Sequence, residues 1–373
     1  MSLKLYHTSD VHIGMRFMHY PQDVQEALIE ARFTVLETMV SQADQAGCQL
    51  FVVAGDLFEK QNVSRRDVLR TRQILSGFGG TVCLLPGNHD YISESSELWK
   101  VFAEGMPDNM IILGEEGPVE LEEGDARIIF WPAPCHTKHS QENNLGWLAG
   151  RTPDQGTFTI GVAHGALEGL SPDGDGRYFS MSVGELSGIP ADLWLLGHTH
   201  LPWPAEPSVR DHRIFNAGTP EPDGMDCRHE GGAWVIDIDD NRRVQAERVS
   251  TGQYRFADRE ETVRSREDLD RIRESVLGQN PEKTLTRLSL SGYVDEELYG
   301  QRQAFIRELA EATVYLDVRD EDLRVRFTPE RIRQEFSEGS LPAILLAELM
   351  DTHGEDTAHL AYEIIREVKH DAN

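Results

Sequence analysis

Short apolar runs alternate with longer amphipathic stretches along the first 85 residues of the chain. The runs at residues 3–8, 50–54 and 82–85 are the length of strands and are dominated by apolar side chains. Between them, residues 23–46 and 64–78 predict helices. In the first of these, Val24, Leu28, Ala31 and Val35 recur at three- and four-residue spacing and predict one buried face. This order of elements predicts a layered α/β domain.

Strand-like segments predominate from residue 110 onward. They lie at residues 110–113, 127–131, 157–163, 193–196, 213–216 and 233–238. A second sheet that covers the first would account for all of them.

The pattern changes near Tyr254, where a charged segment at residues 258–274 separates the first domain from a smaller unit. In that unit residues 284–290 and 312–318 predict strands, and residues 296–309 predict a helix. Residues 329–368 predict a helical tail with an apolar face, which either packs on its own domain or docks a partner. We therefore expect a domain at residues 1–256, a small α/β cap at 257–328 and a helical tail at 329–373.

The charge of the chain argues against a general nucleic-acid binder. Among 373 residues, 36 Lys and Arg stand against 64 Asp and Glu, a net charge of −28, and neither half of the chain has a basic excess. Nucleic-acid binders usually present a basic surface. Any binding of phosphate would then depend on local charge, and bound divalent metals are one source of it. Acidity that only keeps the protein soluble is the simpler reading.

Cysteine spacing and hydropathy indicate the cellular setting. Cys48, Cys83, Cys135 and Cys227 are far apart and form no CxxC pair, which disfavours zinc ribbons and disulfide frameworks. No apolar run approaches the roughly 18 residues that a membrane span needs. We expect a soluble cytoplasmic protein with no membrane partner.

Side chains that bind metals follow five of the predicted strands. The carboxyl ends of strands in open α/β sheets are where ligands bind. One such side chain is unremarkable, but five strand ends that each supply one are hard to obtain by chance. The number of ligands suits two divalent ions bridged by one carboxylate, and mixed nitrogen and oxygen ligands favour Mn, Fe, Zn or Co over Ca or Mg. The residues are Asp10, His12, Asp56, Asn88, His89, His164, His198 and His200.

In order and spacing these residues resemble the calcineurin-like metallophosphoesterases. The resemblance rests on Asp10-x-His12, Gly55-Asp56, Gly87-Asn88-His89-Asp90, His164 and Gly197-His198-x-His200. It implies a four-layer αββα sandwich of two sheets between helices over about residues 1–250. It also implies Asp10, His12 and His200 on one metal, Asn88, His164 and His198 on the other, and Asp56 bridging both.

The resemblance leaves His89 without a metal and implies that it is the general acid. Two ions roughly 3.5–4 Å apart can clamp phosphoryl oxygens and activate a water near neutral pH. The leaving alkoxide then needs a proton, which an imidazole beside the site can donate. Mn²⁺ is the cofactor that we expect.

Within this superfamily the chain is most similar to the SbcD-type DNA repair nucleases. The segments that carry this similarity are residues 8–14 (TSDVHIG), 53–58 (VAGDLF) and 217–222 (AGTPEP). The resemblance implies an exo- and endonuclease that acts on DNA with an SbcC-type ATPase, which the helical tail would dock. Archaeal members place a histidine where Glu59 stands here.

Two other functions remain open. The charge of −28 favours a small-molecule phosphodiesterase or pyrophosphatase of the same superfamily. The second alternative is a non-catalytic scaffold that keeps the fold without activity, and the intact set of ligand residues argues against it. Arg16, His19 and Tyr20 follow the first motif and either contact substrate phosphates or form a plain surface loop. Four arginines at residues 65, 66, 70 and 72 predict an exposed helix face, with a DNA-binding or homodimer surface as the alternative.

Overall fold

The computed structural model describes residues 2–171, 176–278, 280–326 and 328–371. The chain divides into two compact units, Met1–Phe256 and Ala257–Asn373. No helix among the described residues combines the length and the apolar character that crossing a membrane requires.

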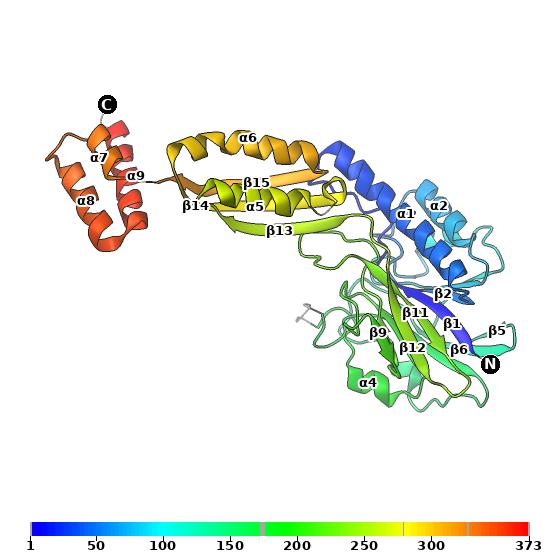
Figure 1. The fold of residues 1–373 in the computed structure, drawn as a ribbon. Helices are drawn as coiled ribbons and strands as arrows, with labels where there is room; N and C mark the ends of the chain where they lie inside the picture. The colour runs from blue at the N-terminus through cyan, green and yellow to red at the C-terminus, as the bar shows by residue number, and fades with distance from the viewer. Residues whose placement is uncertain (1, 172–175, 279, 327, 372–373) are drawn as a thin grey trace. The chain divides into compact units, whose positions relative to one another are not determined.

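The first unit contains two sheets (Figure 1). The seven-stranded sheet has the order β4-β3-β2-β1-β11-β12-β9, and the five-stranded sheet has the order β10-β8-β7-β6-β5. The strands of the first sheet are β1 (Leu3–Thr8), β2 (Leu50–Ala54), β3 (Thr81–Leu85), β4 (Met110–Ile112), β9 (Ser208–Arg210), β11 (Gly232–Ile238) and β12 (Val244–Ser250). Those of the second are β5 (Val119–Glu123), β6 (Ala126–Ala133), β7 (Phe158–His164), β8 (Leu193–Gly197) and β10 (Ile214–Asn216).

Three apolar clusters separate four layers. One joins the first sheet to α1 (Gln22–Gln45), α2 (Arg65–Leu75) and α3 (Glu97–Ala103). A second fills the space between the sheets, and a third covers the outer face of the second sheet with α4 (Val183–Gly188) and the turn Gly146–Leu148. The strand β2 shows why the central runs are wholly apolar: Phe51 and Val53 enter the first cluster, while Leu50 and Val52 enter the second. The predicted four-layer α/β sandwich is confirmed.

The division of the later strands between the sheets differs from the expectation. β4 and β11, together with β12 and β9, join the first sheet, and only β5, β6, β7, β8 and β10 form the second. Figure 1 shows β11 and β12 running alongside β1, and β11 pairs antiparallel with β1 from Leu3↔Ile238 to His7↔Trp234. An apolar pattern indicates that a strand is buried but not which strand it pairs with. The sequence therefore could not assign these strands to one sheet or the other.

The second unit has its own three-stranded sheet, β13-β14-β15. The strands β13 (Arg255–Thr262), β14 (Thr284–Val294) and β15 (Tyr315–Val325) pack with α5 (Arg266–Leu277) and α6 (Glu296–Ala312) around one apolar cluster. The helices α7 (Pro329–Glu335), α8 (Leu341–His353) and α9 (Glu355–Asp371) share another cluster.

The interpretation of residues 258–274 as a separating segment was wrong. They contain most of β13 and of α5, in which Leu269, Ile272 and Val276 are buried. Edge strands and amphipathic helices expose many charged side chains, so the charged composition of this segment did not reveal the strand and the helix.

Candidate metal centre

Five parallel strands bring the predicted residues together at their carboxyl ends. β1, β2 and β3 are parallel in the first sheet, and β7 and β8 are parallel in the second. Each strand ends at or just before a residue with metal-ligand chemistry. Asp10, His12, Asp56, Asn88 and His164 are buried, with exposed fractions of 0–2 %.

Asp10, His12 and His200 form the first group of converging side chains. His12 Nε2 lies 3.2 Å from His200 Nε2, and both nitrogens lie 3.9 Å from Asp10 Oδ1. Ligand atoms of these three residues all lie within 4.8 Å of one another. That spacing would allow one ion to contact all three.

Asn88, His164 and His198 form the second group. Asn88 Oδ1 lies 2.9 Å from His164 Nε2 and 3.1 Å from His198 Nδ1. The carboxylate of Asp56 lies between the groups, since its Oδ2 is 3.8 Å from His12 Nε2 and 3.3 Å from His164 Nε2. The structure therefore brings all seven predicted ligands into two adjacent groups.

The backbone at these positions is held in an unusual conformation. Asp10, His12, Asp56 and His198 have positive φ values of 54°, 53°, 52° and 95°. Non-glycine residues rarely adopt this left-handed region, and where they do so the strain often marks a functional site. At Gly87 an added Cβ would lie 2.3 Å from Asp56 Oδ1, so only glycine lets this turn approach the carboxylate.

Hydrogen bonds at the outer ring nitrogens determine where the imidazole protons lie. His12 Nδ1 is 2.9 Å from Glu59 Oε2, and His200 Nδ1 is 2.9 Å from Asp223 Oδ2. An ionised carboxylate only accepts, so both rings donate from Nδ1. In neutral rings the two Nε2 lone pairs then face each other at 3.2 Å, which is unfavourable unless a cation lies with them.

His164 repeats this arrangement in the second group. Its Nδ1 donates to the carbonyl oxygen of Ala54 at 2.8 Å, which leaves Nε2 facing the oxygen of Asn88. The nitrogen and the oxygen are both acceptors when the ring is neutral. The nitrogen and oxygen atoms that converge in each of the two groups therefore fit the binding of cations.

The buried carboxylates also favour positive charge at this cluster. Burial by itself lowers the pKa of His164, but the charge of Asp56 and a hydrogen bond to it raise that pKa to about 9. Burial likewise lowers the pKa of His200, and the hydrogen bond to Asp223 with the charge of Asp10 raises it to about 9. Burial raises the pKa of Asp56, yet the surrounding histidines hold it well below its usual range.

His89 lies beside both groups. Its backbone N–H donates to Asp56 Oδ1 at 2.8 Å, and its Nδ1 lies 2.9 Å from the carbonyl oxygen of Glu59. The side chain is 30 % exposed, and its ring meets that of His12 edge to face at 5.0 Å. The carbonyl holds Nδ1, and the residue borders the cavity described next.

A cavity of about 530 Å³ opens over the two groups. Asp56, Asn88, His89, His198 and His200 border it from the predicted set. Its other wall comes from residues that the sequence did not single out: Ser171, Tyr178, Thr199, Leu201, Asp223, Asp226, Cys227 and His229.

Arg16, His19 and Tyr20 are absent from that lining among the described residues. Arg16 and His19 are exposed, and the ring of Tyr20 lies 6.3 Å from that of Phe256. The structure gives these three residues no place in the cavity wall.

Asp223 and Tyr178 escaped the sequence analysis because neither comes directly after the end of a strand. Asp223 hydrogen-bonds His200 from the loop that follows β10, and Tyr178 stacks on the ring of His198 at 5.2 Å. Asp223 is one residue after the AGTPEP segment that carried the resemblance. Its position directly after this segment is the sequence signal that could have identified Asp223.

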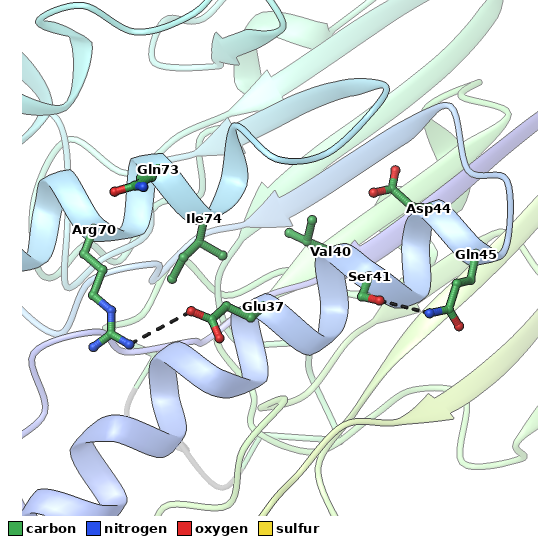
Figure 2. Close-up of a pocket in the computed structure, with 8 residues that line it drawn as sticks. All are labelled: Glu37, Val40, Ser41, Asp44, Gln45, Arg70, Gln73 and Ile74. Carbon is green, nitrogen blue, oxygen red and sulfur yellow. Dashed lines mark hydrogen bonds and ion pairs between the residues drawn. The ribbon is translucent and has the colours of Figure 1, made fainter.

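The arginine-rich helix α2 is largely paired with acidic or carbonyl oxygens. Arg70 donates to Glu30 at 2.7 and 2.5 Å and lies 4.0 Å from Glu37, a pair that Figure 2 shows beside a groove between α1 and α2. Arg65 pairs with Glu104 at 2.8 Å, and Arg72 donates to the carbonyl of Phe102 at 3.1 Å. These partners offset much of the positive charge, which favours the exposed-helix interpretation.

The sandwich and the paired ligand groups define a class of phosphoesterases that bind two metals. Residues 3–202 match the family described as calcineurin-like phosphoesterase, and the chain belongs to this family. Members of the family typically bind two divalent metals.

Two curated relatives match part of the chain. It is 26% identical over 207 residues to the uncharacterized metallophosphoesterase YhaO of Bacillus subtilis (strain 168), covering 53% of this chain and 48% of that protein. It is 31% identical over 131 residues to the DNA double-strand break repair protein Mre11 of Methanosarcina mazei, covering 34% of this chain and 19% of that protein. The chain thus spans about half or less of the length of these relatives.

Among solved structures, the chain is similar to the purple acid phosphatase PPD1 from yellow lupin (Lupinus luteus) seeds. The TM-score is 0.42 with 13% identity, over 67% of this chain and 52% of that one.

Proposed function

We propose that this chain is a metal-dependent phosphodiesterase that binds two divalent cations, with Mn²⁺ as the expected metal. Asp10, His12 and His200 would hold one ion. Asn88, His164 and His198 would hold the other, with Asp56 contacting both. The observation that carries this proposal is the convergence of ligand atoms from five strand ends, with His12 Nε2 3.2 Å from His200 Nε2 and His164 Nε2 2.9 Å from Asn88 Oδ1.

Two divalent cations in such a site supply Lewis-acid chemistry, because they withdraw charge from phosphoryl oxygens and lower the pKa of water. The protein orients its ligands through Glu59, Asp223 and the carbonyl of Ala54. His89 would donate a proton to the leaving oxygen, since it borders the cavity and its Nδ1 is already held by the carbonyl of Glu59.

We propose DNA as the substrate, in an exo- and endonuclease of the SbcD type. The sequence similarity to Mre11 and the motif segments at residues 8–14, 53–58 and 217–222 support it. The alternative is a small-molecule phosphodiesterase or pyrophosphatase. The net charge of −28 favours that alternative, as does the cavity wall, where the described lining residues include two aspartates of one loop but neither Lys nor Arg.

An SbcC-type ATPase would dock on the helical tail. The support for this proposal is a set of exposed apolar side chains on α8 and α9, which soluble domains usually bury. They are Leu341, Ile344, Leu345, Leu360 and Ile364, with exposed fractions of 41–78 %.

One assay separates the substrates. The Mn²⁺-loaded protein is incubated with end-labelled single- and double-stranded DNA, bis-p-nitrophenyl phosphate and pyrophosphate, with and without chelator. The nuclease proposal predicts chelator-sensitive cleavage of DNA and of the diester. Cleavage of the diester alone, or of pyrophosphate, would support the small-molecule alternative. Absence of hydrolysis with every substrate would support a non-catalytic scaffold.

A further inference from the structure

The last residue of the Gly87-Asn88-His89-Asp90 motif is a buried carboxylate that belongs to neither ligand group. Asp90 has no exposed surface, whereas the side chain of His89 beside it is 30 % exposed. A carboxylate in such a position is costly to bury unless hydrogen-bond donors surround it. The donors that it finds show what it holds together.

Two backbone N–H groups from different turns donate to this carboxylate. The N–H of Gly87 donates to Asp90 Oδ1 at 2.7 Å, and the N–H of Phe58 donates to Asp90 Oδ2 at 3.0 Å. Gly87 opens the turn that carries the proposed ligand and the proposed acid, and Phe58 stands two residues after Asp56. The side chain therefore joins the two turns that follow β2 and β3.

The helix α3 holds the same two turns through Trp99, which is 3 % exposed. The indole Nε1 of Trp99 donates to the backbone carbonyl of Asp90. The ring of Trp99 also meets that of Phe58 edge to face at 6.1 Å, and Phe58 meets Phe102 in the same way at 6.1 Å. All three aromatic residues belong to the apolar cluster between the first sheet and its helices. The core thus fixes the backbone of Asp90, and its side chain fixes the turns.

The two turns lie too close together to tolerate much movement. An added Cβ at Gly87 would lie 2.3 Å from Asp56 Oδ1, and the backbone N–H of His89 donates to the same oxygen at 2.8 Å. Asp56 itself has a positive φ of 52°. A non-glycine residue stays in this left-handed region only where surrounding contacts hold it there. The hydrogen bond from Phe58 to Asp90 is such a contact.

An asparagine at position 90 could not make both hydrogen bonds. A carboxylate accepts at both of its oxygens, whereas an amide has one oxygen and an NH₂ group that only donates. One of the two backbone N–H groups would then face another donor in a site closed to water, which is unfavourable. We expect the turns to shift in response, and a displacement of about 1 Å at a reacting group can lower a rate by about 10²-fold.

We propose that Asp90 is a positioning residue whose carboxylate fixes the spacing of Asn88 and His89 from the bridging Asp56. It contacts neither metal nor substrate and acts through the backbone of the two turns. The inference rests on the proposed two-metal function. It deepens that function, because it assigns the retention of one ion and the alignment of the acid to one buried side chain.

The first measurement is the binding of Mn²⁺ to the metal-free full-length protein, followed by electron paramagnetic resonance of free and bound Mn²⁺. Asn88→Ala identifies the ion that this turn helps to hold, because that ion should no longer bind. Asp90→Asn should weaken the binding of the same ion by about 10- to 100-fold, the usual effect of removing a group that orients a ligand. The affinity of the other ion should change by less than about 3-fold.

The second measurement compares two small diesters at saturating Mn²⁺, where both ions are bound. Bis-p-nitrophenyl phosphate releases a phenolate that needs little protonation, whereas diphenyl phosphate releases a more basic one. Asp90→Asn should lower kcat for diphenyl phosphate by at least about 10-fold and kcat for the activated diester by less than about 3-fold. In the His89→Ser protein the same change should cost less than about 3-fold, because the acid that it aligns is already absent.

Asp192→Asn is the matched control. The carboxylate of Asp192 also accepts a backbone N–H, that of Thr159 at 2.9 Å, but it precedes β8 at the amino end of that strand. This variant should change the Mn²⁺ affinities and both rates by less than about 3-fold. Thermal unfolding checks that each variant folds. If Asp90→Asn does not fold, Trp99→Phe keeps an aromatic ring in place, removes the N–H that holds the Asp90 carbonyl, and should give the same pattern at about 3- to 10-fold.

Unchanged Mn²⁺ binding with unchanged kcat for both diesters would overturn the inference. Equal losses on the two diesters, a further loss of about 10-fold in the His89→Ser protein, or an equal effect of Asp192→Asn would also overturn it, because general loosening of the fold would then be the cause. Failure of the proposed function is a separate result, in which both ions bind but neither diester is hydrolysed. Weaker Mn²⁺ binding in Asp90→Asn would still support the positioning of Asn88 in that case, and unchanged binding would overturn it.

Discussion

The carboxylate of Asp56 lies between two sets of ligands that come from four other strands. Its Oδ2 is 3.8 Å from a histidine nitrogen of one set and 3.3 Å from a histidine nitrogen of the other. Its Oδ1 also accepts the backbone N–H of His89. One side chain therefore joins both proposed metal positions to the proposed acid.

Replacing Asp56 by asparagine should remove bound metal and activity together. The substitution keeps the size of the side chain but removes the charge that both ions would share. Metal content by mass spectrometry should fall below one ion per chain, and hydrolysis of a small diester should fall by at least about 10²-fold. Two ions at full occupancy in this variant would show that Asp56 does not bridge them.

His89→Ser should keep both ions but lose cleavage of substrates with poor leaving groups. DNA cleavage should fall by about 10²- to 10⁴-fold, the usual contribution of a positioned proton donor. Hydrolysis of bis-p-nitrophenyl phosphate should fall far less, because p-nitrophenolate leaves with little need of a proton. Equal losses on both substrates would indicate a positioning role, and loss of one ion would make His89 a ligand.

His7 should make the metal-free protein less stable in acid. It lies fully buried on β1 with Nε2 3.3 Å from the carbonyl of Phe215, and burial lowers its pKa to about 4. The unfolded chain therefore binds a proton more readily than the folded one, and this residue destabilises the fold as pH drops from about 6.5 towards 4.

Denaturant unfolding in chelator at pH 7 and pH 4.5 measures this effect against His7→Gln. The wild type should lose about 2 kcal/mol more than the variant between the two pH values. The same loss in both proteins would mean that His7 does not resist protonation.

At the level of elements, every residue of the candidate site lies within the first unit. The last residues of this unit are held to its own core, because the carboxylate of Glu221 accepts hydrogen bonds from the backbone N–H groups of Gln253 and Tyr254 at 2.7 and 2.8 Å. The three clusters between its layers also end before residue 256. The second unit has separate cores.

A truncation that ends at Phe256 should therefore fold, bind two ions and hydrolyse bis-p-nitrophenyl phosphate within about 3-fold of the full chain. Any activity on DNA should fall more, since we propose that the second unit contributes substrate or partner selection. Circular dichroism, metal content and the two assays check this. A folded, metal-loaded truncation that is inactive on the diester would place a required group beyond residue 256.

At the level of the whole molecule, a net charge of −28 should give DNA cleavage an unusual dependence on salt. A basic nuclease loses affinity steeply as salt rises, because the counterions that its cationic side chains displace from the phosphates gain less entropy when they are released into concentrated salt. Here salt should screen repulsion, so KM for DNA should stay constant or fall between about 50 and about 200 mM NaCl. Hydrolysis of bis-p-nitrophenyl phosphate at the same salt concentrations controls for effects of salt on the enzyme that do not involve DNA binding. A steep rise of KM for DNA alone would reveal a basic binding surface.

The sequence alone predicted the alternation of strands and helices from β1 to β3, several of the later strands, and the eight residues that converge at the candidate site, but not α3, α4, β5, β9 or β12. Runs such as Leu50–Ala54 are apolar throughout because both faces of the central strands are covered, and this pattern is local. The ligands could be found because each follows a strand directly, and parallel strands bring their carboxyl ends to one edge.

Only the tertiary structure decided which strands share a sheet and which groups support the ligands. The pairing of β11 with β1 joins residues more than two hundred positions apart, and β13 is a charged strand whose pattern does not distinguish it from a loop. Asp223 reaches His200 through a loop that Arg32 holds from α1. Contacts of this kind depend on the distance between side chains in the folded chain, and no local pattern of residues records that distance.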